Sequence, residues 1–84
     1  MPLFMDIHEN LPAGTTAQDV AGAHEADLRV QAKYGVKYIR YFMDEASGKV
    51  WCVSDAPSAE ASVKVHEEAH GLVPDRIFPV VEGS

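Results

Sequence analysis

The chain has 84 residues, and its 7 Lys and Arg residues against 13 Asp and Glu residues give a formal net charge of −6. A chain of this length buries about 60% of its surface on folding, which allows one small domain, and an acidic chain without a Lys/Arg cluster is a poor partner for nucleic acid. No apolar run approaches the roughly 20 residues that span a bilayer, and the sequence shows no signal-peptide pattern, so we expect no membrane partner. Cys52 is the single cysteine and cannot form an intramolecular disulfide, so we expect a cytoplasmic protein.

The first half of the chain predicts a strand followed by a long helix. Leu3–Glu9 alternates with a period of two, which is typical of a strand. Helical spacing then extends over Thr16–Tyr34 and ends before Gly35, a residue that favours a helix C-terminus. At the start of this helix Thr15 and Thr16 are both candidate N-caps, and Thr15 with Gln18 would form a capping box.

The second half predicts a hairpin, a second helix and a last strand. Val36–Asp44 and Lys49–Asp55 are rich in β-branched and aromatic residues and are separated by a short turn that contains glycine. A second helix is expected over Ser58–Gly71, with the serine as its cap. The last strand, Ile77–Glu82, contains Pro79, which predicts a position at the edge of the sheet.

The order β-α-β-β-α-β in so short a chain predicts a single ferredoxin-like α+β domain over residues 1–84, an antiparallel sheet with both helices on one face. We expect Met5 and Ile7 to face the helices. The residues then expected on the open face of the sheet are Phe4, Asp6, His8, Tyr38, Arg40 and Phe42. Because exposed aromatic side chains need a cover, we expect a homodimer that packs sheet against sheet.

The second helix contains the sequence His66-Glu67-Glu68-Ala69-His70, which matches the H-E-x-x-H pattern of zinc proteases. The third ligand and substrate cleft that a protease requires are not evident, so we do not expect one. The spacing still places two imidazoles on one side of a helix, one turn apart. The pair is therefore either a two-histidine metal site or a solvated pair that the helix dipole favours.

Two further histidines extend this hypothesis. His24 and Asp27 form a polar stripe on the first helix, which is either a hydrogen-bonded interior network or part of a metal site. His8 and Glu9 end the first strand, and this end lies at the same edge of the sheet as the end of the second helix. Mixed imidazole and carboxylate ligands suit nickel, zinc, copper or cobalt. Cys52, between two apolar residues, is interpreted as a small buried hydrophobic residue.

Four segments resemble a family of small bacterial nickel-binding proteins, namely FMDIHE, AGAHEADLRVQAKYGVKYIRYF, GKVWCVSDAPSAEA and VHEEAHGLVPDRIFPV. The resemblance implies a dimeric ferredoxin-like fold, nickel bound at the dimer surface, a role in sequestration or detoxification, and no established catalytic activity. The candidate metal ligands in the matching segments are Asp6, His8, Glu9, His24, Asp27, His66 and His70.

The leading hypothesis is therefore a non-enzymatic protein that binds Ni²⁺ through histidine and carboxylate groups and loses the ion as the pH falls through about 6.5. An alternative is a dimeric small-molecule-binding protein or enzyme. It would use Asp6, His8, Tyr38 and Arg40 as an acid/base pair, a phenol and an anion anchor. A third hypothesis is a purely structural dimer whose histidines only satisfy hydrogen bonds.

Overall fold

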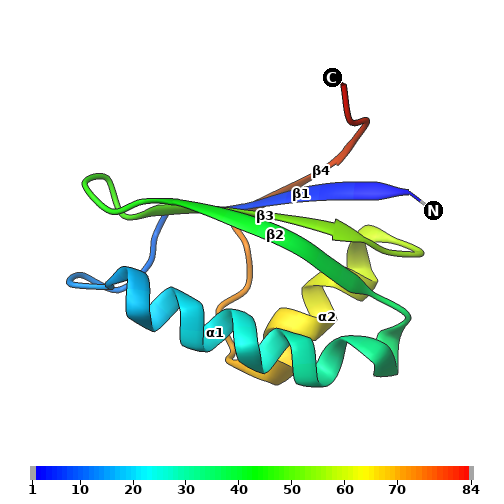
Figure 1. The fold of residues 1–84 in the computed structure, drawn as a ribbon, viewed down its shortest axis with the longest axis horizontal. Helices are drawn as coiled ribbons and strands as arrows, with labels where there is room; N and C mark the ends of the chain where they lie inside the picture. Colours follow the sequence, from blue (N-terminus) through cyan, green and yellow to red (C-terminus); the bar gives the residue numbers. More distant parts are fainter. Residues whose placement is uncertain (1, 84) are drawn as a thin grey trace.

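The computed structural model describes residues 2–83, and Figure 1 shows them as a sheet with both helices on one face. In chain order the elements are β1 (Leu3–His8), α1 (Ala17–Val30), a 3-10 turn η1 (Gln31–Tyr34), β2 (Lys37–Asp44), β3 (Lys49–Asp55), α2 (Ala59–Ala69) and β4 (Arg76–Val80). The sheet order is β2-β3-β1-β4, and every neighbouring pair is antiparallel. The predicted ferredoxin-like α+β fold is confirmed, and β4 is an edge strand as its proline predicts.

The face of β1 that packs against the helices is the reverse of the predicted one. Phe4, Asp6 and His8 are buried between the sheet and the helices, whereas Met5 and Ile7 are half-buried on the open face. A period of two separates the two faces of a strand without showing which one is covered. The expectation fails because the inner face of this strand is partly polar.

The predicted positions of the β2 residues are correct for Arg40 and Phe42 and wrong for Tyr38. The register with β3 shifts between Tyr38 and Arg40, which marks a β-bulge. The bulge lets Tyr38 point into the molecule, where it is 4% exposed, while Arg40 and Phe42 lie on the open face as expected. The prediction that Tyr38 occupies the open face is wrong, because the bulge changes which residues alternate inward.

The start of α1 uses the second of the two predicted N-caps, and the predicted capping box between Thr15 and Gln18 is wrong. The side-chain oxygen of Thr16 accepts a hydrogen bond from the backbone of Asp19 at 3.1 Å. The Asp19 carboxylate in turn accepts from the backbone N–H of Thr16 at 3.0 Å, which completes a capping box without Gln18. No helix among residues 2–83 is both long enough and apolar enough to cross a membrane.

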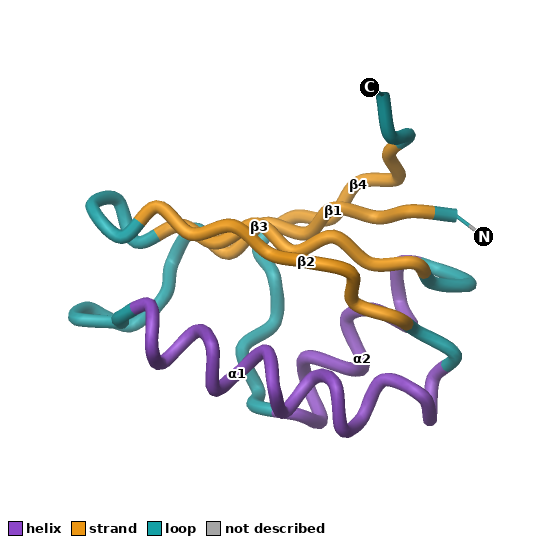
Figure 2. Tube along the Cα trace, in the orientation of Figure 1, coloured by secondary structure: helices purple, strands orange, loops and turns teal. Residues whose placement is uncertain are grey.

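The interior is small and unusually polar. The buried apolar residues are Phe4, Val20, Val36, Tyr38, Val50, Cys52, Ala56 and Val65. Polar groups share the same layer: the hydroxyls of Ser54 on β3 and Ser62 on α2 lie 2.8 Å apart and hydrogen-bond to each other. Figure 2 shows that α1 and α2 lie on the same side of the sheet, the side that these buried residues face. A polar interior requires partners for every buried group.

The capping box leads to a first prediction. Thr16→Ala should lower the free energy of unfolding by about 1 kcal/mol, because the N–H of Asp19 loses its side-chain acceptor. Gln18→Ala is the matched control, since Gln18 is exposed and outside the observed box. Urea denaturation of the two variants measures the difference. Equal losses in both variants would contradict the assignment of the cap.

Candidate metal centre

The centre of the interior is His66, a residue of α2 that is only 1% exposed. Its Nε2 atom lies 3.1 Å from Oδ2 of Asp6 on β1, and its Nδ1 atom lies 3.0 Å from Oδ1 of Asp27 on α1. A neutral imidazole carries one N–H, so it can donate to only one of two carboxylates. The geometry therefore assigns a proton to each nitrogen, and the ring is an imidazolium held between two carboxylates.

The balance of electrostatic effects agrees with this assignment. Burial by itself would lower the pKa of His66, but the hydrogen bonds to Asp27 and Asp6 outweigh burial and raise the pKa to about 11. Burial would raise the pKa of Asp6, yet its contacts with His66 and His8 lower that pKa to about 2. The pKa of Asp27 is also lowered: burial opposes the shift, and the hydrogen bonds with His66 and His70 produce it.

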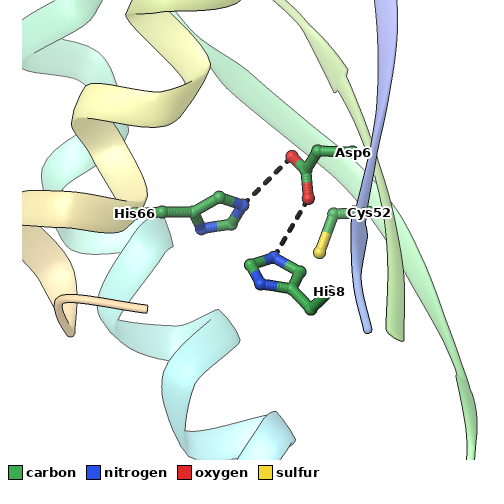
Figure 3. Close-up of side chains that lie close together, drawn as sticks. All are labelled: Asp6, His8, Cys52 and His66. Carbon is green, nitrogen blue, oxygen red and sulfur yellow. Dashed lines mark hydrogen bonds and ion pairs between the residues drawn. The ribbon is translucent and has the colours of Figure 1, made fainter. Parts of the chain in front are cut away.

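Asp6 connects several side chains on the floor of this site. Its Oδ1 atom lies 3.1 Å from Nε2 of His8, which Figure 3 shows beside the imidazole of His66. The hydroxyl of Tyr38 lies 3.2 Å from Oδ2 of Asp6 and 3.0 Å from the backbone oxygen of Ser62. Burial raises the pKa of Tyr38, with the Asp6 carboxylate adding to the effect, so the phenol keeps its proton.

Asp27 makes the corresponding connection on the other side of His66. Its Oδ1 atom lies 3.0 Å from Nε2 of His70 as well as from His66. The backbone N–H of Leu72 donates to Nδ1 of His70 at 3.1 Å. Because Nδ1 accepts this hydrogen bond, a neutral His70 carries its proton on Nε2 and donates it to Asp27.

Cys52 joins the cluster although the sequence interpretation made it only a small hydrophobic residue. It lies on β3 directly opposite Asp6 in the register with β1 and is buried. Figure 3 shows its sulfur beside the ring of His8. Burial raises the pKa of the Cys52 thiol to about 11, so the thiol is protonated at neutral pH. The signal that sequence reasoning missed is register: a β1–β3 pairing that aligns Asp6 with Cys52 places both on the inner face.

These donors form two groups that share His66. In the first, one donor atom each from Asp6, His8, Cys52 and His66 lies within 4.8 Å of the others; in the second, the same is true of Asp27, His66 and His70. Imidazole, carboxylate and thiolate are the ligand types that bind divalent transition metals. The arrangement is therefore chemically suited to hold such an ion against either nitrogen of His66.

A cavity of about 320 Å³ gives access to the cluster. His8, Cys52, His66 and His70 all contribute to its wall. The rest of the lining comes from the loop after β1, from the inner side of α1, and from Tyr41, Val50 and Leu72. Residues 12–14 of the loop are exposed, so the cavity opens toward solvent.

Other candidate residues lie outside the two donor groups. His24 lines the cavity but packs against Tyr41, with ring centroids 4.8 Å apart and the ring planes tilted by 43°. The Glu9 carboxylate forms an ion pair with the Arg76 guanidinium. Arg40 is exposed on the open face of the sheet, away from Asp6, His8 and Tyr38. The four residues of the alternative small-molecule hypothesis therefore do not share one pocket.

Comparison with known proteins places this geometry in a family context. The family model described as "Nickel responsive protein SCO4226-like" matches residues 4–80. The crystal structure of SCO4226 from Streptomyces coelicolor A3(2) superposes with a TM-score of 0.88 at 39% sequence identity, covering 98% of this chain and 99% of that one. Comparison with curated proteins gave no significant match.

The imidazolium of His66 predicts how stability depends on pH in the metal-free protein. Its pKa lies above the unfolded value of 6.5, so its contribution is complete below pH 6.5 and is lost as the pH rises toward 11. Asp6 acts in the opposite sense: its contribution is present above pH 3.8 and is lost as the pH falls toward 2. The free energy of unfolding should therefore be greatest between pH 3.8 and pH 6.5.

Urea denaturation at a series of pH values, with a chelator present, measures this dependence. We expect a loss on the order of 2 kcal/mol between pH 6.5 and about pH 9. His66→Gln should remove most of this alkaline loss, whereas His24→Gln should retain it. A free energy of unfolding that stays constant across the alkaline window in the wild-type protein would exclude the buried imidazolium.

Proposed function

Because the chain belongs to the SCO4226-like family of nickel responsive proteins, we propose that it binds Ni²⁺ and serves in nickel sequestration or detoxification without being an enzyme. The observation that carries the proposal is the pair of donor groups around His66, whose atoms lie within 4.8 Å of one another. The five histidine and carboxylate donors in these groups are Asp6, His8, Asp27, His66 and His70. Zinc, copper and cobalt use similar ligands and are expected competitors.

The donor set fits a metal ion in a specific respect. Oδ1 of Asp6 is fully buried, and no described residue donates an aligned hydrogen bond to it, although Nε2 of His8 lies 3.1 Å away. A buried carboxylate oxygen without a donor is costly unless a cation or another donor satisfies it. The cluster lies between the sheet and the helices, with the cavity as its entrance, and this interior position differs from the surface position that the family resemblance implies.

The free thiol is compatible with a cytoplasmic location. Cys52 is unpaired in the described structure and lines the cavity that leads to the cluster. A reducing compartment keeps such a thiol from oxidation. We therefore propose that the protein binds nickel in the cytoplasm.

Isothermal titration of chelator-treated protein with Ni²⁺ tests the function. Wild-type protein should bind the ion at neutral pH, and the affinity should rise with pH because the metal displaces a proton from His66. His66→Gln should weaken binding at least about tenfold.

Glu9→Gln provides the control for this titration, because Glu9 is a neighbouring carboxylate that pairs with Arg76 instead of the cluster. It should change the affinity less than about twofold. Circular dichroism shows whether each variant is folded. Absence of binding heat in wild-type protein, or binding that His66→Gln leaves unchanged, would refute the assignment.

We further propose that the functional unit is a homodimer formed through the open face of the sheet. The cross-strand register aligns Phe42, Trp51 and Ile7 in one row, and Val53, Met5 and Phe78 in the next. Phe42 is 54% exposed and Phe78 is 44% exposed in the single chain. The family resemblance implies a dimer, and a second copy would present the same apolar rows to this face.

Sedimentation analysis tests the dimer with two variants of equal starting exposure. Phe78→Ser removes a 44% exposed side chain from the open face, and Leu28→Ser removes a 44% exposed side chain from α1. Wild-type protein and the Leu28 variant should sediment at twice the chain mass of 9.2 kDa, whereas the Phe78 variant should shift toward the monomer. A monomeric wild-type protein would exclude the proposal.

A further inference from the structure

The thiol of Cys52 belongs to the donor group on the Nε2 side of His66. One donor atom each from Asp6, His8, Cys52 and His66 lies within 4.8 Å of the others, and all four residues are buried. Figure 3 shows the sulfur, the two imidazoles and the carboxylate turned toward a common region between β1, β3 and α2. A group of this composition is typical of a four-coordinate metal site.

A second observation at the same place points to a cation. Oδ1 of Asp6 has no aligned hydrogen-bond donor among the described residues, although Nε2 of His8 lies only 3.1 Å away. Two ligands of one tetrahedral ion, each about 2.05 Å from the metal, lie about 3.3 Å apart. The oxygen and the nitrogen are therefore spaced as neighbouring ligands of a single ion.

The hydrogen bonds of His70 disfavour the opposite side of His66. The backbone N–H of Leu72 donates to Nδ1 of His70, so Nε2 carries the proton of the neutral ring and points to Asp27. A metal ion bound to Nε2 of His70 would displace this proton. The proton would then move to Nδ1, which would lose its hydrogen bond from Leu72, or it would leave the ring as an imidazolate. On the Nε2 side of His66 the ion displaces the protons of His66 Nε2 and of the Cys52 thiol, but His70 keeps its contacts with Leu72 and Asp27.

We propose that Cys52 coordinates the bound Ni²⁺ as a thiolate, together with Asp6, His8 and Nε2 of His66. This inference rests on the proposed nickel binding and adds to it the position of the ion and a sulfur ligand. On binding, the S–H bond of Cys52 and the Nε2–H bond of His66 break, a sulfur–metal bond and a nitrogen–metal bond form, and both protons leave through the cavity to solvent. Neither the sulfur nor the metal changes oxidation state.

The charges of this ligand set suit a buried position. One thiolate and one carboxylate neutralise a divalent ion, so the four-ligand complex carries no net charge. Asp27 stays outside the complex and accepts a hydrogen bond from Nδ1–H of His66, at the 3.0 Å distance already present. Such a carboxylate orients a metal-binding histidine through its other nitrogen.

Absorption spectroscopy tests the thiolate directly, because Cys52 is the single cysteine of the chain. Reduced, chelator-treated protein is titrated with NiCl₂ while the near-ultraviolet thiolate-to-nickel charge-transfer band is recorded. Wild-type protein should develop this band up to one ion per chain. Cys52→Ser should lack the band and bind nickel at least about tenfold more weakly. Losing a residue that only hydrogen-bonds to a metal ligand already weakens metal binding by about this factor.

His70→Gln tests the alternative position of the ion, because His70 belongs to the donor group on the other side of His66. This variant should keep the thiolate-to-nickel band, since none of the four proposed ligands is removed. Loss of both band and binding in this variant, while its circular dichroism stays native, would place the ion beside Asp27 and overturn the proposal.

X-ray absorption spectroscopy at the nickel edge uses the wild-type complex, so its result does not depend on whether a variant folds. A sulfur scatterer in the first coordination shell is expected. If titration shows bound nickel but the spectrum contains only nitrogen and oxygen ligands, the thiolate assignment is wrong and the nickel-binding function stands. If wild-type protein binds no nickel, both the function and the thiolate assignment are refuted.

Discussion

The imidazole of His66 is held between two carboxylates that come from different parts of the chain, Asp6 on β1 and Asp27 on α1. Separating the buried imidazolium from one of its carboxylates costs several kcal/mol, because a charge is left without a partner. Moving β1, α1 or α2 away from the other two elements would carry this cost. Helix α2 is in this way tied to both the sheet and α1 through a single side chain. Contacts of Tyr38 with Asp6 and with the backbone of Ser62 reinforce the same junction. The charge network therefore connects the two layers alongside the apolar core.

This polar interior has a consequence on the opposite face of the sheet. The inner positions of β1 that the network occupies, Asp6 and His8, are unavailable to apolar side chains. Met5, Ile7 and Trp51 lie instead on the face that the helices leave uncovered. In a small domain apolar area that is not buried within the chain gains most from burial between chains. The proposed dimer and the interior cluster thus follow from the same distribution of residues.

The order of strands and helices could be predicted from local signals, because period, turns and glycine positions act within a few residues. The sides of the strands could not, since alternation is symmetric until a partner is known and the bulge after Tyr38 changes it midway along β2. The sequence did indicate that His66, Asp27 and His8 were unusual. Their convergence depends on contacts between residues 39 and 60 positions apart, which no local pattern contains. Cys52 escaped notice for the same reason.

The nitrogen of His66 that faces Asp6 can hold either a proton or a metal ion, and this competition links folding to binding. In the metal-free protein, the carboxylates of Asp6 and Asp27 and the imidazolium of His66 together carry a net charge of −1. In the proposed complex a divalent ion replaces the Nε2 proton of His66 and the thiol proton of Cys52. Two positive charges enter and two leave, so the buried net charge is unchanged. The interior therefore accepts the ion without a new uncompensated charge, and the protons that stabilise the empty protein are the ones the metal displaces.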